Sequence, residues 1–168
     1  MKLNAFTDVS LRVLMTLGRD PEARRTTQEI ADRIAVPYNH VVKAVGELRR
    51  RGLLEVARGR TGGAVITEAG LDQRVGQLVR ELSTRPEVVD CDGLEGGAPC
   101  PLRDVCGLRT VLARARDAFY AELDQHRVRD LAAHAEAFLG MPVLAAPSAD
   151  RPARAAGVPA PGPCEMLA

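Results

Sequence analysis

Three of the four cysteines, Cys91, Cys100 and Cys106, lie within sixteen residues that are rich in glycine and proline. Thiolates are soft ligands that suit iron-sulfur clusters or zinc, and glycine and proline let a short loop turn around a metal core. Zinc ligands usually come in pairs roughly two to four residues apart, whereas the gaps here are eight and five residues. The spacing therefore favours an iron-sulfur cluster loop, with buried thiols, a disulfide or zinc as the alternatives.

The composition indicates a small, mainly helical protein. Of the 168 residues, 46% are hydrophobic but only 3% are aromatic, so leucine, valine and alanine must supply most of the core. The sequence shows neither the apolar run of a signal peptide nor a stretch long enough to cross a membrane. We therefore expect a cytoplasmic protein with no membrane partner. In that reducing compartment, clustered cysteines are more often metal ligands than disulfides.

The net charge of +1 conceals a difference between the two halves of the chain. Residues 1–70 carry twelve Lys and Arg against eight Asp and Glu, a balance of +4, and residues 71–168 carry eleven against fourteen, a balance of −3. The N-terminal half is thus the candidate for contact with a polyanion.

Two predicted helices joined by a tight turn indicate a helix-turn-helix. After a first helix over about residues 7–18, the capping box Thr26-Thr-Gln-Glu29 begins a short helix. That helix should end before Pro37, which is well suited to begin the next one, over residues 38–51. Val41, Val45 and Leu48, with Val42 alongside, should face inward. The first turns would then present polar side chains to phosphates and base edges, namely Tyr38, Asn39, His40 and Lys43.

A basic hairpin follows the helix-turn-helix. Residues 53–58 and 64–67 predict two strands, and Arg58-Gly-Arg-Thr-Gly-Gly63 predicts the turn between them. Arg58 and Arg60 flank Gly59 on this tip, from which they could enter a narrow minor groove. This order of elements is that of a winged helix.

Helical periodicity returns after the hairpin. We expect one helix over residues 68–83, a long amphipathic helix after Cys106, and a last helix over residues 128–139. So small a body offers little to cover the long helix, which predicts a two-fold dimer that presents two recognition helices to a palindromic operator. The predicted fold is mainly α with a small β-hairpin wing, a winged helix-turn-helix plus a long dimerisation helix. Its parts are a DNA-binding domain (1–83), a cysteine-rich cluster-binding loop (84–107), dimerisation helices (108–139) and a disordered tail (140–168) that contains Cys164, which is not expected to be a ligand.

Four short motifs connect the chain to a known family. They are Phe6-Thr-Asp-Val-Ser-Leu-Arg12, Val36-Pro-Tyr-Asn-His40, Arg58-Gly-Arg-Thr-Gly-Gly63, and the run from Val88-Val-Asp-Cys91 through Cys100-Pro-Leu-Arg-Asp-Val-Cys106 to Ala118-Phe-Tyr120. With them, over roughly residues 1–131, the chain resembles the iron-sulfur winged-helix transcription regulators. Within that family it is most similar to the nitric-oxide-sensing repressors of the NsrR type. Members of the IscR type carry a histidine three residues after the last cysteine, where this chain has Arg109.

The resemblance implies a cofactor and its ligands. It implies a 4Fe-4S cluster held by Cys91, Cys100 and Cys106, with Asp8 of the partner subunit as the fourth ligand. A 2Fe-2S cluster is the alternative. The gap from Cys91 to Cys100 is longer than is usual in the family, and the glycines of the loop can absorb the extra residues.

The resemblance also implies a function. It implies a homodimer that binds double-stranded operator DNA, represses transcription, and releases the DNA when nitric oxide attacks the cluster. Lys43, Arg50 and Arg60 would contact phosphates; the candidates for sequence readout are Tyr38, Asn39, His40 and Arg58, with Gly59 shaping the wing tip. The chain has no nucleophile-base pair at a recognisable spacing, so we do not expect an enzyme. The alternatives are a redox or iron-status regulator with a 2Fe-2S cluster and a zinc- or disulfide-stabilised DNA-binding interaction protein.

Overall fold

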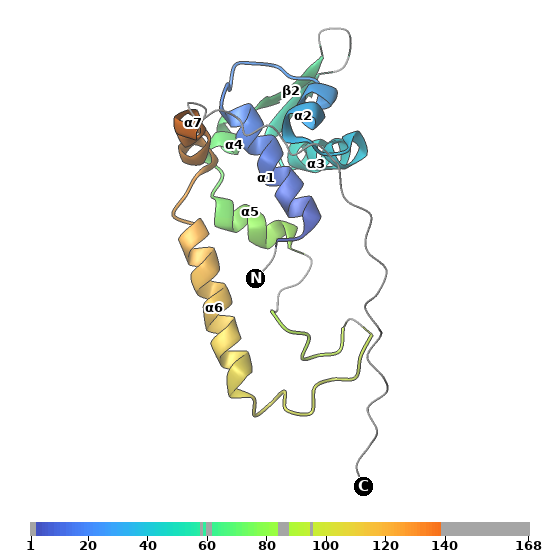
Figure 1. The fold of residues 1–168 in the computed structure, drawn as a ribbon, viewed down its shortest axis with the longest axis vertical. Coiled ribbons are helices and arrows are strands. Elements are labelled where there is room, and N and C mark those ends of the chain that lie inside the picture. Colours follow the sequence, from blue (N-terminus) through green and yellow to red (C-terminus); the bar gives the residue numbers. More distant parts are fainter. Residues whose placement is uncertain (1–2, 58, 60–61, 84–87, 95, 139–168) are drawn as a thin grey trace, which may run out of the picture.

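The computed structural model describes residues 3–57, 59, 62–83, 88–94 and 96–138. In chain order the elements are α1 (Ala5–Gly18), α2 (Thr27–Ile34), α3 (Tyr38–Arg50), β1 (Leu54–Ala57), β2 (Gly63–Ile66), α4 (Glu68–Asp72), α5 (Val75–Leu82), α6 (Gly107–Leu123) and α7 (Val128–Phe138). Figure 1 shows α1 to α4, α7 and the hairpin gathered at one end, with α6 and the cysteine segment extending from it beyond α5. Within the described part of the chain, no helix is long and apolar enough to cross a membrane.

The core is built where α1 packs on α3. One face of α1 buries Val13, Leu14 and Leu17 completely, and α3 meets it with Val41 and Leu48, which are also fully buried. Of all the element pairs, these two helices are in the most extensive contact. Full burial of one such side chain contributes roughly 1.5 to 3 kcal/mol, so this contact holds the helix-turn-helix in place.

The helix-turn-helix forms as predicted. The Glu29 amide donates to Thr26 Oγ1 at 3.2 Å, and the Thr26 amide donates to Glu29 Oε2 at 2.7 Å, which completes the capping box. Hydrogen bonds from the Thr26 amide, and then from its hydroxyl, hold the pKa of Glu29 below its ordinary value. Ala35 ends α2 in the left-handed region at φ 52°, and Pro37 is the N-cap of α3. The turn between the helices is therefore tight.

The hairpin is antiparallel and pairs Leu54 with Ile66 and Ala57 with Gly63. The residues before α2 fasten its base, because Arg25 and Ala64 exchange backbone hydrogen bonds of 3.0 and 2.7 Å. At the tip, Gly59 is exposed with φ 109°, while Arg58 and Arg60 lie outside the described residues. The disordered tail predicted for residues 140–168 also lies outside them.

Two sequence predictions are wrong. The helix expected over residues 68–83 is two helices, because Gln73 and Arg74 are extended. The chain between α6 and α7 pairs with this break: the Val75 amide donates to the His126 carbonyl at 3.0 Å, and the Val128 amide donates to the Gln73 carbonyl at 3.1 Å. Val42, expected to face inward, is 42% exposed.

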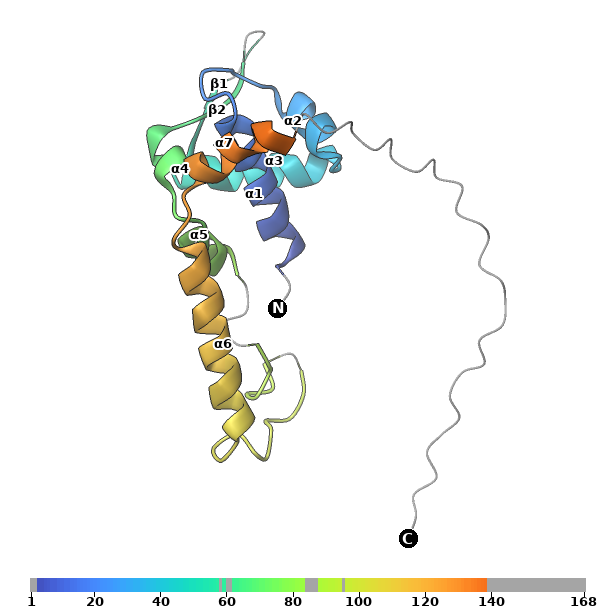
Figure 2. The ribbon, with the colours of Figure 1, turned by 60° about the vertical axis from the view of Figure 1, so that its left-hand side comes forward.

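The two C-terminal helices differ in how they are buried. α7 returns to the helix-turn-helix (Figure 2). There Val128 and Ala132 are fully buried, and the Ala132 Cβ lies 3.0 Å from the position that a Cβ on Gly18 would take. α6 packs mainly against α5, at the end that carries the buried Tyr120, and Leu11 of α1 joins the same apolar cluster. The other end of α6 exposes Leu108 at 62% and Val111 at 60%.

The contact between α5 and α6 depends on Gly76. A Cβ there would lie 2.6 Å from the Tyr120 carbonyl oxygen and would clash with Asp124 Oδ1. Gly76→Ala should therefore lower the free energy of unfolding by about 1 to 3 kcal/mol, because the added methyl group forces the helices apart.

Gly46→Ala is the matched control, since Gly46 is also helical but has nothing within 4 Å of its Cβ position. This substitution should raise the free energy of unfolding by about 0.5 to 1 kcal/mol through helix propensity. Urea unfolding followed by circular dichroism measures both variants. Equal effects would contradict the close packing of α5 on α6.

Candidate nucleic-acid interface and metal centre

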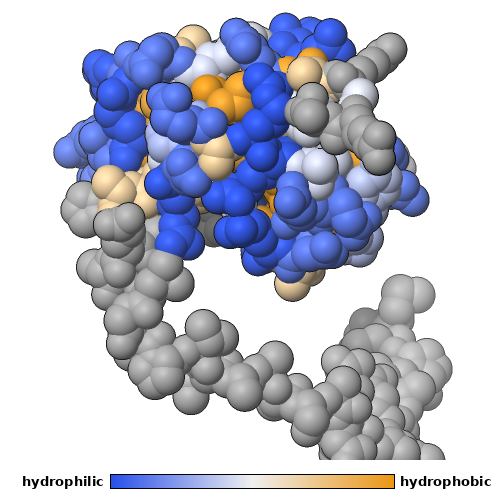
Figure 3. Space-filling model, turned by 90° about the horizontal axis from the view of Figure 1, so that it is seen from above, coloured by the Kyte–Doolittle hydropathy of each residue, from blue (hydrophilic) through white to orange (hydrophobic). Residues whose placement is uncertain are grey.

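The start of α3 presents a polar surface. Tyr38, Asn39, His40 and Lys43 are all exposed, while the opposite face of the helix is buried against α1. Seen from above, the winged-helix end of the molecule is mostly hydrophilic, with a small hydrophobic patch on it (Figure 3). The free amides of the first turn add partial positive charge at the same place. The arrangement suits phosphate and base-edge contacts, because polar groups project from a helix that the core holds rigid.

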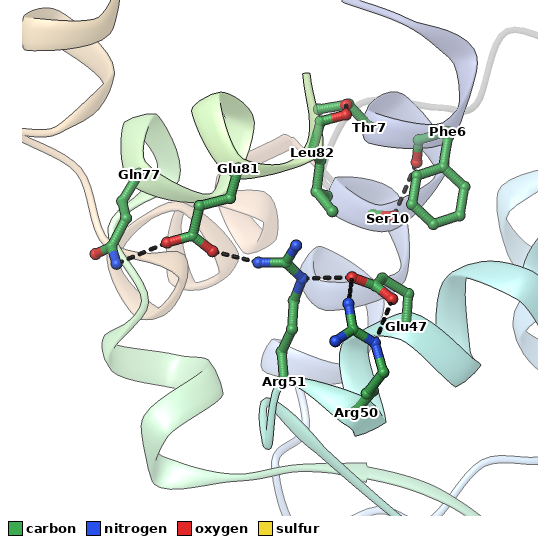
Figure 4. A network of polar contacts seen from close by, with 9 residues as sticks. All are labelled: Phe6, Thr7, Ser10, Glu47, Arg50, Arg51, Gln77, Glu81 and Leu82. Atoms are coloured by element: carbon green, nitrogen blue, oxygen red, sulfur yellow. Dashed lines mark hydrogen bonds and ion pairs between the residues drawn. The ribbon is translucent and has the colours of Figure 1, made fainter. Parts of the chain in front are cut away.

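Arg50 lies at the other end of α3 and is largely exposed, but it is not free. Its Nε and Nη2 atoms donate to the two carboxylate oxygens of Glu47 at 2.9 and 2.6 Å (Figure 4). The hydrogen bonds from Arg50, and next from Arg51, hold the pKa of Glu47 below its ordinary value. By contrast, Lys43 has no ion-pair partner within the described parts of the chain. The two cations are therefore presented differently to a polyanion.

Sequence reasoning assigned no role to Arg24 and Arg49. Both line an open hollow of about 420 Å³ between the end of α3 and β1, together with Glu55. Arg24 Nη1 also donates to the Gly63 carbonyl at 3.0 Å, across 39 positions of sequence. Arg49 belongs to an evident basic run, whereas Arg24 has no local signal, because only the tertiary fold brings it to the wing.

The cysteine segment begins with a closed loop. The Cys100 amide donates to the Cys91 carbonyl at 3.0 Å, so the backbones of these two residues lie side by side. Gly93 lies within the loop at φ 72°, and a side chain there would clash with the Gly97 carbonyl. Arg103 and Asp92 form an ion pair of 2.7 Å across the segment. The described residues of this loop, 91–94 and 96–100, thus form a defined turn.

The three cysteines have suitable chemistry for a cluster but are not gathered around one point. Cys91, Cys100 and Cys106 are free and partly exposed, and Cys106 is the N-cap of α6. Among the described residues, no three or more His, Cys, Asp or Glu side chains form a group that could hold a metal ion. Three accessible thiols on a segment with positive-φ glycines fit the donor requirements of an iron-sulfur cluster.

Asp8 lies in the first turn of α1, where a carboxylate favours the helix dipole. Its side chain is 44% exposed and pairs with Arg12, at 3.0 Å from Oδ2 to Nη2 and 3.1 Å from Oδ1 to Nε. Within one chain, the structure does not bring Asp8 and the cysteines into one group. A role for Asp8 as a ligand therefore depends on a second subunit.

Comparison with known proteins gives concordant results. Residues 3–134 match the Rrf2 family, described as "Iron-dependent Transcriptional regulator". The "HTH-type transcriptional repressor NsrR" of Streptomyces coelicolor is 48% identical over 135 residues, which cover 79% of this chain and 89% of that protein. The "HTH-type transcriptional regulator NsrR" of Shouchella clausii is 33% identical over 132 residues, 78% of this chain and 88% of that protein.

Solved structures share the fold. T. potens IscR has a TM-score of 0.64 at 18% identity, covering 82% of this chain and 90% of that one. CymR, the global cysteine regulator of B. subtilis, has a TM-score of 0.62 at 24% identity, covering 80% of this chain and 98% of that one. The family match spans the winged helix, the cysteine segment and the start of α7. The chain therefore belongs to the Rrf2 family of transcriptional regulators and is not an enzyme.

Proposed function

We propose that this protein is a homodimeric transcriptional repressor that binds operator DNA and senses nitric oxide through an iron-sulfur cluster. The observation that carries the proposal is the exposed polar start of α3 on a helix whose opposite face is fully packed. The name of the Streptomyces coelicolor relative supports the repressor role. The cysteine segment supports the cluster.

DNA binding would use both α3 and the wing. Asn39 and His40, with Tyr38, would reach base edges in the major groove, since they lie on the first turn of the recognition helix. Lys43 and Arg50 would contact phosphates, with Arg50 also held by Glu47. From the wing, Arg58 would enter the minor groove, and Arg60, on the other side of Gly59, would contact phosphates.

A second copy of the chain would cover α6. The half of α6 that lies away from α5 exposes Leu108 and Val111, and the preceding segment exposes Val105 at 81%. Burial of apolar side chains that are exposed together on one helix stabilises the complex with the partner that covers them. Two-fold symmetry would place two recognition helices against a palindromic operator.

Cys91, Cys100 and Cys106 would hold the cluster, with Asp8 of the partner subunit as the fourth ligand. We favour a 4Fe-4S cluster, with 2Fe-2S as the alternative. The bound group would supply iron that reacts with nitric oxide. Asp8 lies on α1, and α1 packs along α3. A displacement of Asp8 would therefore move α1 and, through the packed core, the recognition helix α3.

The first test concerns the ligands. Cys100→Ala should lose the cluster, because only two thiolates remain, while Cys164→Ala should keep it. Iron and sulfide analysis with visible absorption, after anaerobic purification, measures both variants. About four irons per chain in the parent protein supports 4Fe-4S. Two irons would favour the redox or iron-status alternative, and a colourless protein with one zinc would overturn the cluster proposal.

The second test separates the two roles open to Asp8. Asp8→Ala removes both the candidate ligand and the ion pair with Arg12, whereas Arg12→Ala removes only the ion pair. Asp8→Ala should still assemble a cluster on three thiolates but should weaken the spectral response to nitric oxide, and Arg12→Ala should respond normally. Identical responses would mean that Asp8 acts only within α1.

The third test concerns DNA. Lys43→Ala should weaken binding to operator and scrambled DNA alike and reduce the salt slope by about one, as the loss of a phosphate contact requires. Arg58→Ala should cost about 1 to 3 kcal/mol on operator DNA and relax the preference for A-T pairs at the half-site flanks.

Arg127→Ala is the control, because Arg127 is exposed between α6 and α7, away from α3, the wing and the exposed half of α6. It should leave binding unchanged. Titrations on both DNAs at several salt concentrations measure all three variants. Operator binding that is insensitive to Lys43→Ala and to Arg58→Ala would contradict the proposed interface.

A further inference from the structure

A polar network joins the recognition helix to α5, the helix that leads into the cysteine segment (Figure 4). Arg51, the C-cap of α3, donates from Nε to Glu47 Oε1 at 2.7 Å. Through Nη1 it pairs with Glu81 Oε2 on α5. Gln77 fixes that carboxylate from one turn earlier, since its Nε2 donates to Glu81 Oε1 at 2.9 Å. Arg51 thus bridges a carboxylate of α3 and a carboxylate of α5.

The network is better shielded than an ordinary surface ion pair. The side chains of Arg51 and Glu47 are 22% and 21% exposed and that of Glu81 is 41% exposed, against 70% for Arg50. Partial burial weakens screening by water and salt, so the pair holds its geometry more firmly than an exposed pair.

The last turn of α5 is also tied to the start of α1. The Leu82 carbonyl accepts hydrogen bonds from Asn4 Nδ2 at 3.0 Å and from Thr7 Oγ1 at 3.4 Å. Asn4 is itself the N-cap of α1, and its Oδ1 accepts from the Thr7 amide at 2.7 Å. Leu82 is the final residue of α5 and precedes Cys91 by nine positions. The last turn of α5 is therefore held by α1 and α3 together.

The chain leaving the cysteine segment returns to the same helix. The C-terminal end of α6 packs on α5, where Arg80 Nη2 pairs with Asp124 Oδ2 at 2.6 Å. The Cζ atom of the same guanidinium lies 5.1 Å from the centre of the Tyr120 ring. Arg80 and Glu81 are neighbours, so α5 contacts α6 through one side chain and α3 through the next. α5 is thus the last helix before the cysteine segment and also holds the far, C-terminal end of the helix that follows it.

We propose that Glu81 and Arg51 are positioning residues. They couple the position of the C-terminal end of α3 to the position of α5, and α5 in turn responds to the state of the cysteine segment. This inference rests on the proposed function, because it specifies how that function is regulated. It is separate from the apolar contact of α1 with α3, which contains neither residue.

The test compares operator affinity with and without the cluster. Glu81→Gln keeps the shape of the side chain but removes its charge. The affinity with the cluster divided by the affinity without it should therefore fall about two- to fivefold, the range expected for one partly exposed ion pair. Glu81→Lys should lower the ratio further, because an ammonium group would face the Arg51 guanidinium. Asp72→Asn is the matched control. Like Glu81, Asp72 is partly exposed, at 47%, and forms an ion pair with arginine, but its partners Arg127 and Arg129 join α4 to the chain at the start of α7. Its ratio should equal that of the parent protein.

Hydrogen exchange on the cluster-free protein gives an independent measurement. The Arg51 amide donates to the Glu47 carbonyl at 3.1 Å in the last turn of α3. Glu81→Gln should speed exchange of the amides in that turn, and Asp72→Asn should not. If Glu81→Gln has the same affinity ratio and the same exchange rates as the parent protein, the inference is wrong and the proposed function still stands. A parent protein that binds operator DNA equally with and without its cluster would overturn the proposed function, and the inference with it.

Discussion

The packing of α1 on α3 is the contact on which the rest of the structure depends. α1 contributes Val9, Val13, Leu14 and Leu17 to it, and the other elements of the helix-turn-helix are arranged around that face. α2 packs against both helices, and β2 and α7 each contact α1. Because the buried faces of α1 and α3 are fixed against each other, the polar face of α3 can project into solvent without losing its orientation.

This contact also brings the two candidate sites into one structure. Asp8 lies on α1, the candidate DNA contacts lie on α3, and the cysteine segment is joined to both through α5. A packed core has few intermediate arrangements, so small displacements at one site become discrete changes at another. In this chain the cysteine segment is bracketed by α5 and α6, two helices that contact each other.

Local signals explain most of what could be predicted from the sequence. The capping box at Thr26, the proline before α3 and the alternating hairpin strands each depend on neighbouring residues, and the structure shows all three. The break between α4 and α5 could not be predicted, because its cause is pairing with the chain around Arg127, more than fifty residues away. For the same reason Arg24 at the wing and Glu81 beside Arg51 gave no signal. The exposure of the α3 candidates agrees with the prediction, while their DNA contacts and the cluster ligands stay predictions.

The return of α7 to α1 has a consequence for how the protein is made. Gly18 lies against Ala132, and Val128 belongs to the same core as Leu17. At a synthesis rate of roughly 5 to 20 residues per second, on the order of ten seconds separates the emergence of α1 from that of its last packing partner. In the last few seconds of that interval, at the same rate, the whole cysteine segment has left the ribosome while one side of α1 is still uncovered. The three thiols are therefore accessible from outside before the core of the winged helix is closed.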